Sequence, residues 1–86
     1  MRKEVFNVYI LRCSTGELYV GCTGNLEKRV EEHNRGRGSR FTRSRIPVKL
    51  VYSEECRSRK EAVCKERQLK RKTRREKLEL IGMVYA

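Results

Sequence analysis

The segment NVYILRCSTGELYVG, residues 7–21, decides the fold that this sequence predicts. Two stretches rich in Val, Ile, Leu and Tyr flank residues 14–16, Ser-Thr-Gly, whose composition is typical of a turn. The segment therefore predicts a β-hairpin with arms at about 5–13 and 17–22. A three-residue loop with glycine in the left-handed position is a common way to connect such arms.

This loop fixes the register of the hairpin, because it sets Cys13 opposite Glu17 and thus Tyr9 opposite Gly21. Side chains alternate between the two faces of a strand, so Tyr9 and Tyr19 are predicted on one face, with a glycine leaving space beside one of them. The other face is apolar and predicts the core. A two-residue loop would instead put the tyrosines on opposite faces. Each tyrosine alone is also consistent with a half-buried packing residue whose hydroxyl lies at the rim.

Length and charge restrict the class of protein. The 86 residues are expected to form a single domain over 1–86, and 22 basic against 11 acidic residues give a net charge of +11. On a chain with periodic apolar segments, this charge favours a nucleic-acid partner, with an anionic membrane surface or an acidic protein as alternatives. No segment has the apolar length of a signal peptide or of a membrane span, so we expect a cytoplasmic protein without membrane contact.

The four cysteines are spaced unlike zinc ligands. Cys13, Cys22, Cys56 and Cys64 contain no CxxC pair, which argues against a zinc module. In a cytoplasmic protein we expect reduced thiols that pack as small apolar side chains.

A short helix is predicted at 26–34, after cap-type residues. Its helical spacing gives a buried stripe of Leu26, Val30 and His33, and it places Arg29 at the edge of the contact with the sheet. Arg29 is also consistent with an ordinary solvated arginine, and His33 with a helix-end side chain that hydrogen-bonds locally.

Residues 35–47, RGRGSRFTRSRIP, carry five arginines with no acidic residue nearby to offset their charge. Arginine among Gly, Ser and Thr suits phosphate contacts, so the segment is interpreted as a pliable nucleic-acid-binding loop; the alternative is a loop that is merely soluble. The single aromatic side chain of the segment either stacks on a base or is buried. The predicted nucleic-acid-binding residues are Arg35, Arg37, Arg40, Phe41, Arg43 and Arg45.

The rest of the chain predicts one strand and two helices. A strand at 48–53 has Val48, Leu50 and Tyr52 on one face. Helices are expected at 59–72 and 74–81, each opening with a Ser/Thr-x-x-Glu capping box.

Glu66 is the anomaly of the first of these helices. With Ala62 and Leu69 it occupies positions i, i+4 and i+7, so a carboxylate lies on the apolar stripe. A carboxylate there costs stability unless it has a partner. Glu66 is therefore interpreted either as a functional carboxylate or as the acidic partner in a salt bridge to Lys70 or Arg67.

Four short motifs, in order along nearly the whole chain, resemble the GIY-YIG nuclease domain. They are Asn7-Val8-Tyr9, Tyr19-Val20-Gly21, Arg29 within LEKRVEEHN, and Glu66 within AVCKE. The run RGRGSRFTR and a final LIG are most similar to the small stand-alone YhbQ-like group, which is related to the nuclease domain of the repair subunit UvrC. The resemblance implies an α+β fold, with a small three-stranded antiparallel sheet flanked by helices in the order strand, strand, helix, strand, helix, helix.

The resemblance also implies an activity: metal-dependent, structure-selective DNA endonuclease cleavage in DNA repair or recombination. Glu66 would hold one divalent cation, Mg²⁺ or Mn²⁺, and Arg29 would stabilise the transition state. Tyr9 or Tyr19 would take the proton from the attacking water; Tyr9 is preferred as the base, with Tyr19 as its hydrogen-bonding partner, and His33 would assist.

The expected partner is DNA, with RNA as the alternative, and a protein partner for targeting is also compatible because no second domain is predicted to select the substrate. Two other functions remain open: a nucleic-acid-binding module with little or no catalysis, and a basic adaptor for an acidic protein. The adaptor gives the two tyrosines and Glu66 no role.

Overall fold

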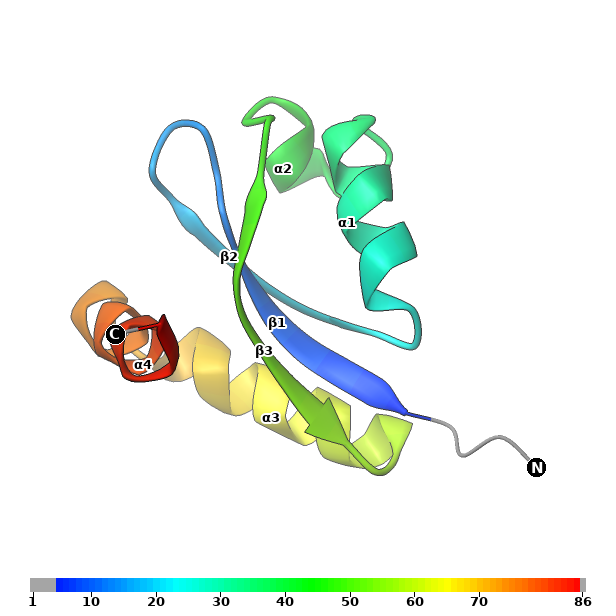
Figure 1. Cartoon of the computed structure of the whole chain (residues 1–86), viewed down its shortest axis with the longest axis vertical. Coiled ribbons are helices and arrows are strands. Elements are labelled where there is room, and N and C mark those ends of the chain that lie inside the picture. Colours follow the sequence, from blue (N-terminus) through cyan, green and yellow to red (C-terminus); the bar gives the residue numbers. More distant parts are fainter. Residues whose placement is uncertain (1–4, 86) are drawn as a thin grey trace.

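The structure is a computed structural model, and it describes residues 5–85 (Figure 1). The predicted elements are all present in the predicted order, and one further helix, α2, lies inside the segment that was expected to be a pliable loop. The elements are β1 (Phe6–Arg12), β2 (Leu18–Thr23), α1 (Leu26–Asn34), α2 (Arg40–Arg43), β3 (Lys49–Cys56), α3 (Arg59–Arg71) and α4 (Arg74–Tyr85).

The three strands form an antiparallel sheet, as expected, and their order in the sheet is β2-β1-β3. The hairpin has the predicted register, since Tyr9 lies opposite Gly21. Its loop is also as predicted: Gly16 has a φ of +94°, and its N–H donates to the carbonyl of Cys13 at 2.9 Å. Tyr9 and Tyr19 consequently share one face of the sheet.

Helices cover both faces of the sheet, with α1 and α2 on one side and α3 and α4 on the other (Figure 1). Two clusters of buried side chains fill the spaces between the sheet and the helices on each of its faces. The cluster under α1 comprises Tyr9, Leu11, Cys13 and Val48. The cluster against α3 comprises Val8, Ile10, Val20, Tyr52, Cys56, Ala62 and Leu69. Since β1 is central and buried, both faces of this one strand anchor the molecule.

The prediction that Tyr52 shares a face with Leu50 was wrong, because β3 contains an irregularity. Ile10 of β1 lies opposite Tyr52, whereas the next residue, Leu11, lies opposite Leu50, which leaves Val51 as an extra residue. A β-bulge of this kind reverses the alternation of side chains beyond it. Leu50 therefore packs with the Tyr9 cluster, and Tyr52 packs on the opposite face.

Local capping sets where the helices begin. Both predicted capping boxes form, with backbone N–H groups donating to Ser58 Oγ and Thr73 Oγ1 at 3.1 Å. The first helix has the predicted bounds of 26–34. The last helix was expected to end at residue 81, but it continues through Gly82. A glycine inside a helix costs only about 1 kcal/mol relative to alanine, which is too little to end a helix that packs against the core.

Two further expectations concern the burial of the cysteines and the absence of a membrane-spanning helix. All four cysteines are free, and Cys13 and Cys56 are buried as expected for small apolar side chains, whereas Cys64 is exposed, contrary to that expectation. Within residues 5–85, no helix combines the length and the apolar character needed to cross a membrane.

Candidate active site

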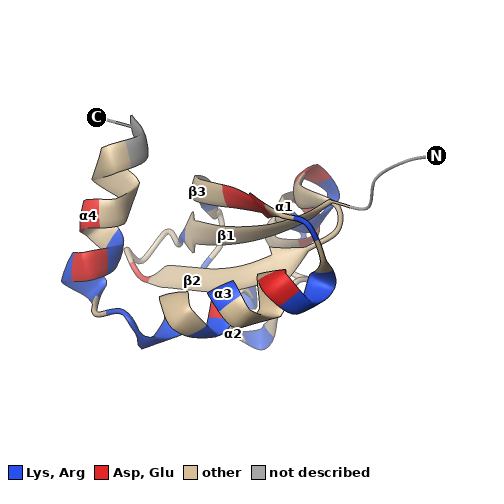
Figure 2. Cartoon of the chain, turned by 90° about the horizontal axis from the view of Figure 1, so that it is seen from below, with Lys and Arg blue, Asp and Glu red and all other residues tan. Residues whose placement is uncertain are grey.

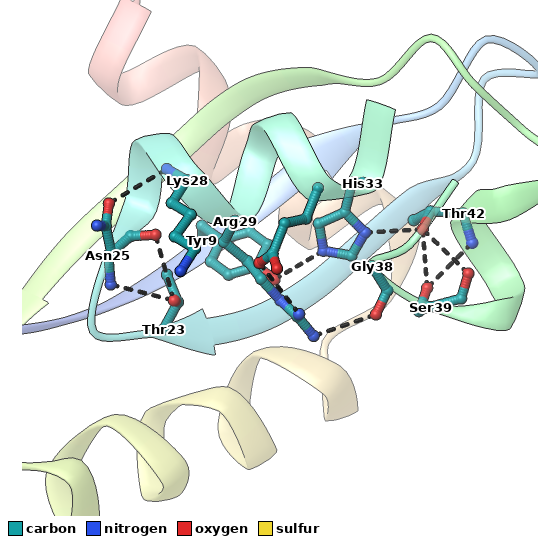
Figure 3. A network of polar contacts seen from close by, with 10 residues as sticks. Tyr9, Thr23, Asn25, Lys28, Arg29, His33, Gly38, Ser39 and Thr42 are labelled. Atoms are coloured by element: carbon teal, nitrogen blue, oxygen red, sulfur yellow. Dashed lines mark hydrogen bonds and ion pairs between the residues drawn. The ribbon is translucent and has the colours of Figure 1, made fainter. Parts of the chain in front are cut away.

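Tyr9, His33 and Thr42 form a buried chain of hydrogen-bonded side chains, which we call the tyrosine–histidine network (Figure 3). The Tyr9 hydroxyl lies 3.0 Å from His33 Nε2, and His33 Nδ1 lies 2.7 Å from Thr42 Oγ1. Tyr9 is only 1% exposed, and the other two residues are completely buried. The network thus joins α1 and α2 to β1, with Tyr9 and His33 separated by 24 positions in the sequence.

The interpretations that Tyr9 is a half-buried residue with its hydroxyl at the rim, and that His33 only bonds locally, were both wrong. His33 bonds to a residue 24 positions away, through the core under α1. The reason is the helical stripe, which points the imidazole straight at the face of the sheet that carries Tyr9.

Two glycines make room for this network. A Cβ at Gly21 would lie 2.5 Å from the Tyr9 hydroxyl, and a Cβ at Gly38 would overlap with the imidazole of His33. The space that the sequence predicted beside a tyrosine is therefore occupied by the phenol. The backbone at Gly38 packs against the imidazole of His33.

Burial sets the charge state of the network. It raises the pKa of Tyr9 to about 12, although the neighbouring Arg29 guanidinium acts in the opposite direction. It also lowers the pKa of His33, and the positive charge of Arg29 adds to this effect. Phenol and imidazole are therefore both neutral at neutral pH, so one ring nitrogen of His33 donates a hydrogen bond and the other accepts one.

Arg29 lies where α1 meets the sheet, as predicted, and its guanidinium is held in place rather than freely solvated. Its Nη2 donates to the carbonyl of Gly38 at 3.1 Å, and its Nη1 lies 3.6 Å from the carboxylate of Glu32. About a third of the side chain, 34%, remains exposed. In Figure 3 the guanidinium lies beside Tyr9 and extends past β2. Arg29 thus presents a fixed positive charge to solvent next to the phenol.

Tyr19 contacts the network through its ring. Its ring centroid lies 5.2 Å from that of His33 and 6.5 Å from that of Tyr9. Tyr19 was expected to be the hydrogen-bonding partner of Tyr9, but in the structure the partner of the Tyr9 hydroxyl is His33. Tyr19 is half-buried, and its ring also stacks on Phe41 at 6.0 Å. The ring of Tyr19 thus contacts both the imidazole of His33 and the ring of Phe41 on α2.

Glu66 approaches from the other face of the sheet, since α3 packs on the side opposite Tyr9. Its side chain is 20% exposed and lies 2.6 Å from Lys70 Nζ, so one of the salt bridges considered from the sequence is present. Glu66 also lines a hollow of about 390 Å³, which we call the Glu66 hollow. The other residues that line it are Phe6, Cys22, Thr23, Gly24, Arg59 and Val63.

The carboxylate of Glu66 is ionised. Burial acts to raise its pKa, but hydrogen bonding from Cys22 and Lys70 and the positive charges of Lys70 and Arg67 outweigh burial and lower it. Within residues 5–85, no three His, Cys, Asp or Glu side chains gather closely enough to enclose a metal ion. A single ionised carboxylate facing an open hollow instead suits a cation that keeps most of its water, as Mg²⁺ does.

The two halves of the site meet at the edge of β2. Cys22, on this strand, interacts with both: burial and then Glu66 raise the pKa of its thiol to about 11, and the thiol in turn contributes to the raised pKa of Tyr9. Further along the strand, Tyr19 helps to raise the pKa of Lys70, the ion-pair partner of Glu66. The thiol of Cys22 and the phenol of Tyr9 are both uncharged at neutral pH, so the two halves of the site are linked by their place on one edge strand.

The basic segment is more ordered than expected. Its charge was expected to be unopposed, but Arg45 pairs with Glu17 of the hairpin and Arg35 pairs with Glu31 at 2.5 Å. The Arg45 guanidinium also lies 4.0 Å above the ring of Phe41. Among the described residues, no ion pair involves the exposed side chains of the three remaining arginines of the predicted set, which are Arg37, Arg40 and Arg43.

Thr42 and Ser39 were not identified as candidate residues from the sequence. Ser39 Oγ caps α2 by accepting from the N–H of Thr42 at 3.1 Å, and it lies 2.9 Å from Thr42 Oγ1. These contacts fix the hydroxyl that holds His33. The one signal in the sequence was the spacing Ser-x-x-Thr inside the family-like run RGRGSRFTR, which is a short capping pattern.

The family model of the GIY-YIG catalytic domain matches residues 5–79. The chain belongs to the GIY-YIG family. A UPF0213 protein of Clostridium perfringens is 51% identical over 87% of this chain and 81% of its own length. A UPF0213 protein of Streptococcus agalactiae is 47% identical over 86% of this chain and 84% of its own length.

Two solved structures that are more than 30% identical to this chain have a similar fold. The solution NMR structure of a UPF0213 protein from Bacillus halodurans superposes with a TM-score of 0.60, at 35% identity, over 92% of this chain and 84% of that chain. A solution NMR structure from E. faecalis gives a TM-score of 0.64, at 32% identity, over 98% of this chain and 90% of that one. The resemblance carried by the four motifs is confirmed, and the GIY-YIG family is a family of nucleases whose substrate is nucleic acid.

Proposed function

We propose that this GIY-YIG protein is a metal-dependent endonuclease that hydrolyses phosphodiester bonds in DNA. The observation that carries the proposal is the hydrogen bond of 3.0 Å between the buried Tyr9 hydroxyl and His33, next to the partly exposed guanidinium of Arg29. A phenol bonded to a neutral imidazole is a route for a proton, and the adjacent cation is placed for an anionic substrate.

The network supplies a general base that avoids a free phenolate. In the tautomer with the proton on His33 Nδ1, that nitrogen donates to Thr42, so Nε2 accepts from the Tyr9 hydroxyl. As Tyr9 takes a proton from the attacking water, its own proton passes to Nε2. The hydroxide formed attacks phosphorus, the phosphorus–oxygen bond to the leaving strand breaks, and the departing oxygen takes a proton from solvent.

This relay explains why a phenol with a pKa of about 12 can act near neutral pH. A tyrosine that had to ionise fully would be a rare base at pH 7, whereas one that exchanges protons with an imidazole never carries a full charge. Because burial and the charge of Arg29 lower the pKa of His33, its ring is neutral near pH 7 and Nε2 has a lone pair for the proton.

Arg29 would bind the non-bridging phosphate oxygens. Its charge is fixed before the substrate arrives, because Gly38 and Glu32 hold the guanidinium. Preorganised donors of this kind stabilise the negative charge that develops in the transition state. Glu66 would hold a divalent cation, Mg²⁺ or Mn²⁺, which when bound polarises the phosphate and stabilises the leaving oxygen.

The basic surface supports recognition of DNA shape more than of sequence. Figure 2 shows Lys and Arg positions on α2 and α3, and both of these helices contact β2. Arginines and lysines on a surface bind phosphates, which carry no sequence information directly. We therefore propose structure-selective cleavage, of the kind used in DNA repair or recombination, with RNA as the alternative substrate and with a protein partner contributing to targeting in the cytoplasm.

The test is a cleavage assay on labelled single-stranded, duplex, flap and junction DNAs, plus RNA, with Mg²⁺ or Mn²⁺. We expect at least one branched DNA to be cut, and we expect Glu66→Gln and Arg29→Ala each to lower the rate about 100-fold or more. The matched controls are Glu79→Gln and Arg75→Ala, two exposed residues of α4, which should cut normally. Equal rates in Glu66→Gln and wild type would refute the proposal.

A second function is supported by the ion pair between Glu66 and Lys70. In the free protein the positive charge of Lys70 offsets the negative charge of the Glu66 carboxylate, as expected for a nucleic-acid-binding module with little catalysis. In that case binding should weaken steeply with salt and should not change in Glu66→Gln. The cleavage panel separates the two functions, because only the nuclease depends on the metal and on Glu66.

A further inference from the structure

A second hollow, of about 250 Å³, lies along the edge of β2 and has no role in the chemistry proposed above. We call it the β2 pocket. Three elements besides the strand approach it: α2, α3 and α4. The residues that line it are Leu18, Tyr19, Val20, Phe41, Lys70 and Lys77.

The β2 pocket adjoins both halves of the candidate active site. Tyr19 is a wall of the pocket, and the centroid of its ring lies 5.2 Å from that of His33. Lys70 also lines the pocket, and it forms the ion pair with Glu66 at 2.6 Å. A group bound here would therefore be a near neighbour of a phosphate held between Arg29 and Glu66.

The chemistry of the walls selects the kind of ligand. Two aromatic rings and two aliphatic side chains form an apolar surface, and the charged side chains that line the pocket are both lysines. Phe41 remains 38% exposed, and Tyr19 stacks on it with an interplanar angle of 23°. Arg45 covers part of the Phe41 ring but does not line the pocket, so it braces the ring without filling the space.

We infer that the β2 pocket binds one unpaired nucleobase of the DNA strand that is cut. The base would pack against Phe41, Tyr19 and the aliphatic walls, and Lys70 and Lys77 would bind the phosphates on either side of it. Stacking of a base on an aromatic side chain combined with cationic groups along the backbone is the usual way to bind single strands. A paired base inside a duplex cannot enter a hollow of this size between a strand edge and three helices.

This inference rests on the proposed nuclease function and specifies its substrate class. DNA with an unpaired nucleotide beside the scissile phosphate, as in a flap, a gap or a junction, would be preferred over a continuous duplex. Structure selectivity would then arise within the catalytic domain itself, from a base that only distorted DNA can offer.

The experiment measures binding without cleavage, by fluorescence anisotropy in EDTA at fixed salt. Three DNAs are compared: a duplex with one unpaired nucleotide at a branch, the same branched DNA with an abasic residue at that position, and a fully paired duplex without the branch. We expect the unpaired base to strengthen binding about fivefold or more over the abasic residue, and we expect the abasic DNA and the duplex to bind alike.

Two variants assign this preference to the pocket. Phe41→Ala should abolish the difference between base and abasic residue, while Ile46→Ala, another exposed apolar side chain of the same segment, should retain it. Thermal unfolding of both variants checks that they fold. Lys77→Gln should weaken binding of all three DNAs by a similar factor, because it removes a phosphate contact rather than a base contact.

Equal binding of the base-containing and abasic DNAs would overturn the inference, and so would a preference that survives in Phe41→Ala. Failure here is distinguishable from failure of the nuclease. If the protein cuts branched DNA but binds base-containing and abasic DNA equally, the nuclease proposal stands and the inference about the β2 pocket is rejected. If the protein binds the base-containing DNA more tightly but never cuts any DNA, the inference about the β2 pocket stands and the nuclease proposal is rejected.

Discussion

Gly21→Ala tests how closely the backbone of β2 approaches the phenol of Tyr9. The added Cβ would lie 2.5 Å from the Tyr9 hydroxyl and 2.7 Å from its Cζ, far inside van der Waals contact. Tyr9 cannot retreat, because it is 1% exposed and packed beneath α1. The variant must therefore distort the sheet or displace the ring and break the hydrogen bond to His33.

Inserting a methyl group into a packed core costs about 1–3 kcal/mol, and in a domain of this size each kcal/mol lowers the melting temperature by about 4–8 °C. Thermal unfolding followed by circular dichroism measures this loss, and the cleavage assay measures the displacement of Tyr9. The matched control is Gly82→Ala in α4, where an added Cβ meets nothing within 4 Å. Because alanine favours helix, this control should gain up to about 1 kcal/mol.

An unchanged melting temperature in Gly21→Ala would refute the reasoning, since a clash of this size cannot be absorbed without cost. Stability lost equally in both glycine variants would also refute it, because the effect would then come from replacing glycine in general. A destabilised Gly21→Ala that still cuts DNA at the wild-type rate would retain the packing argument and reject Tyr9 as the base.

Three further predictions concern the network and the basic surface. Tyr9→Phe leaves His33 Nε2 buried without a partner, so it should lose about 1–3 kcal/mol in thermal unfolding as well as activity. The folded state lowers the pKa of His33 from its ordinary value of 6.5, so the unfolded chain binds a proton at this residue more readily. The stability that comes from a neutral His33 is therefore present above about pH 6.5 and is lost as the pH falls toward the folded pKa. Melting temperatures at pH 7.5 and pH 5.5 measure this loss. Replacing Arg37, Arg40 and Arg43 with alanine should reduce the slope of log binding constant against log salt by about 0.9 for each DNA phosphate that the protein no longer neutralises.

Each of these predictions has its own control. Tyr19→Phe should keep the stability of the wild type, because the ring contacts of Tyr19 do not involve its hydroxyl. An equal loss of stability in Tyr9→Phe and Tyr19→Phe would contradict the prediction for Tyr9→Phe. His33→Gln should show a smaller loss on acidification than wild type, and an identical loss would assign the effect to the carboxylates. Arg35→Ala, whose charge is already paired with Glu31, should change the salt slope less than an unpaired arginine does.

The parts of the fold that could be predicted are those that neighbouring residues determine. The hairpin register followed from a three-residue loop and strict alternation, and the bounds of α1 followed from its cap and its apolar stripe. The orientation of Tyr52 could not be predicted, because a bulge in β3 depends on how two strands meet and leaves no signal in one of them. The pairing of Arg45 with Glu17 likewise joins residues 28 positions apart, which no local pattern specifies.

The candidate site was predicted unevenly for the same reason. Tyr9, Tyr19 and Arg29 lie where alternation and helical spacing put them. The role of His33 as the partner of Tyr9 required knowledge of how α1 crosses the sheet, and Thr42 is brought to it by a single turn of helix in a segment that seemed irregular. Glu66 forms the salt bridge to Lys70 that the sequence offered as one interpretation, but its approach from the opposite face depends on how α3 passes the edge of the sheet.

The order β2-β1-β3 leaves the molecule with two unequal edges. A strand from another protein that extended the sheet at β2 would lie along the backbone of Leu18 and Val20 and would close the approach to both halves of the site. The same addition at β3 would leave them open. A partner strand at β3 is therefore compatible with the proposed cleavage of DNA, whereas a partner strand at β2 would inhibit it.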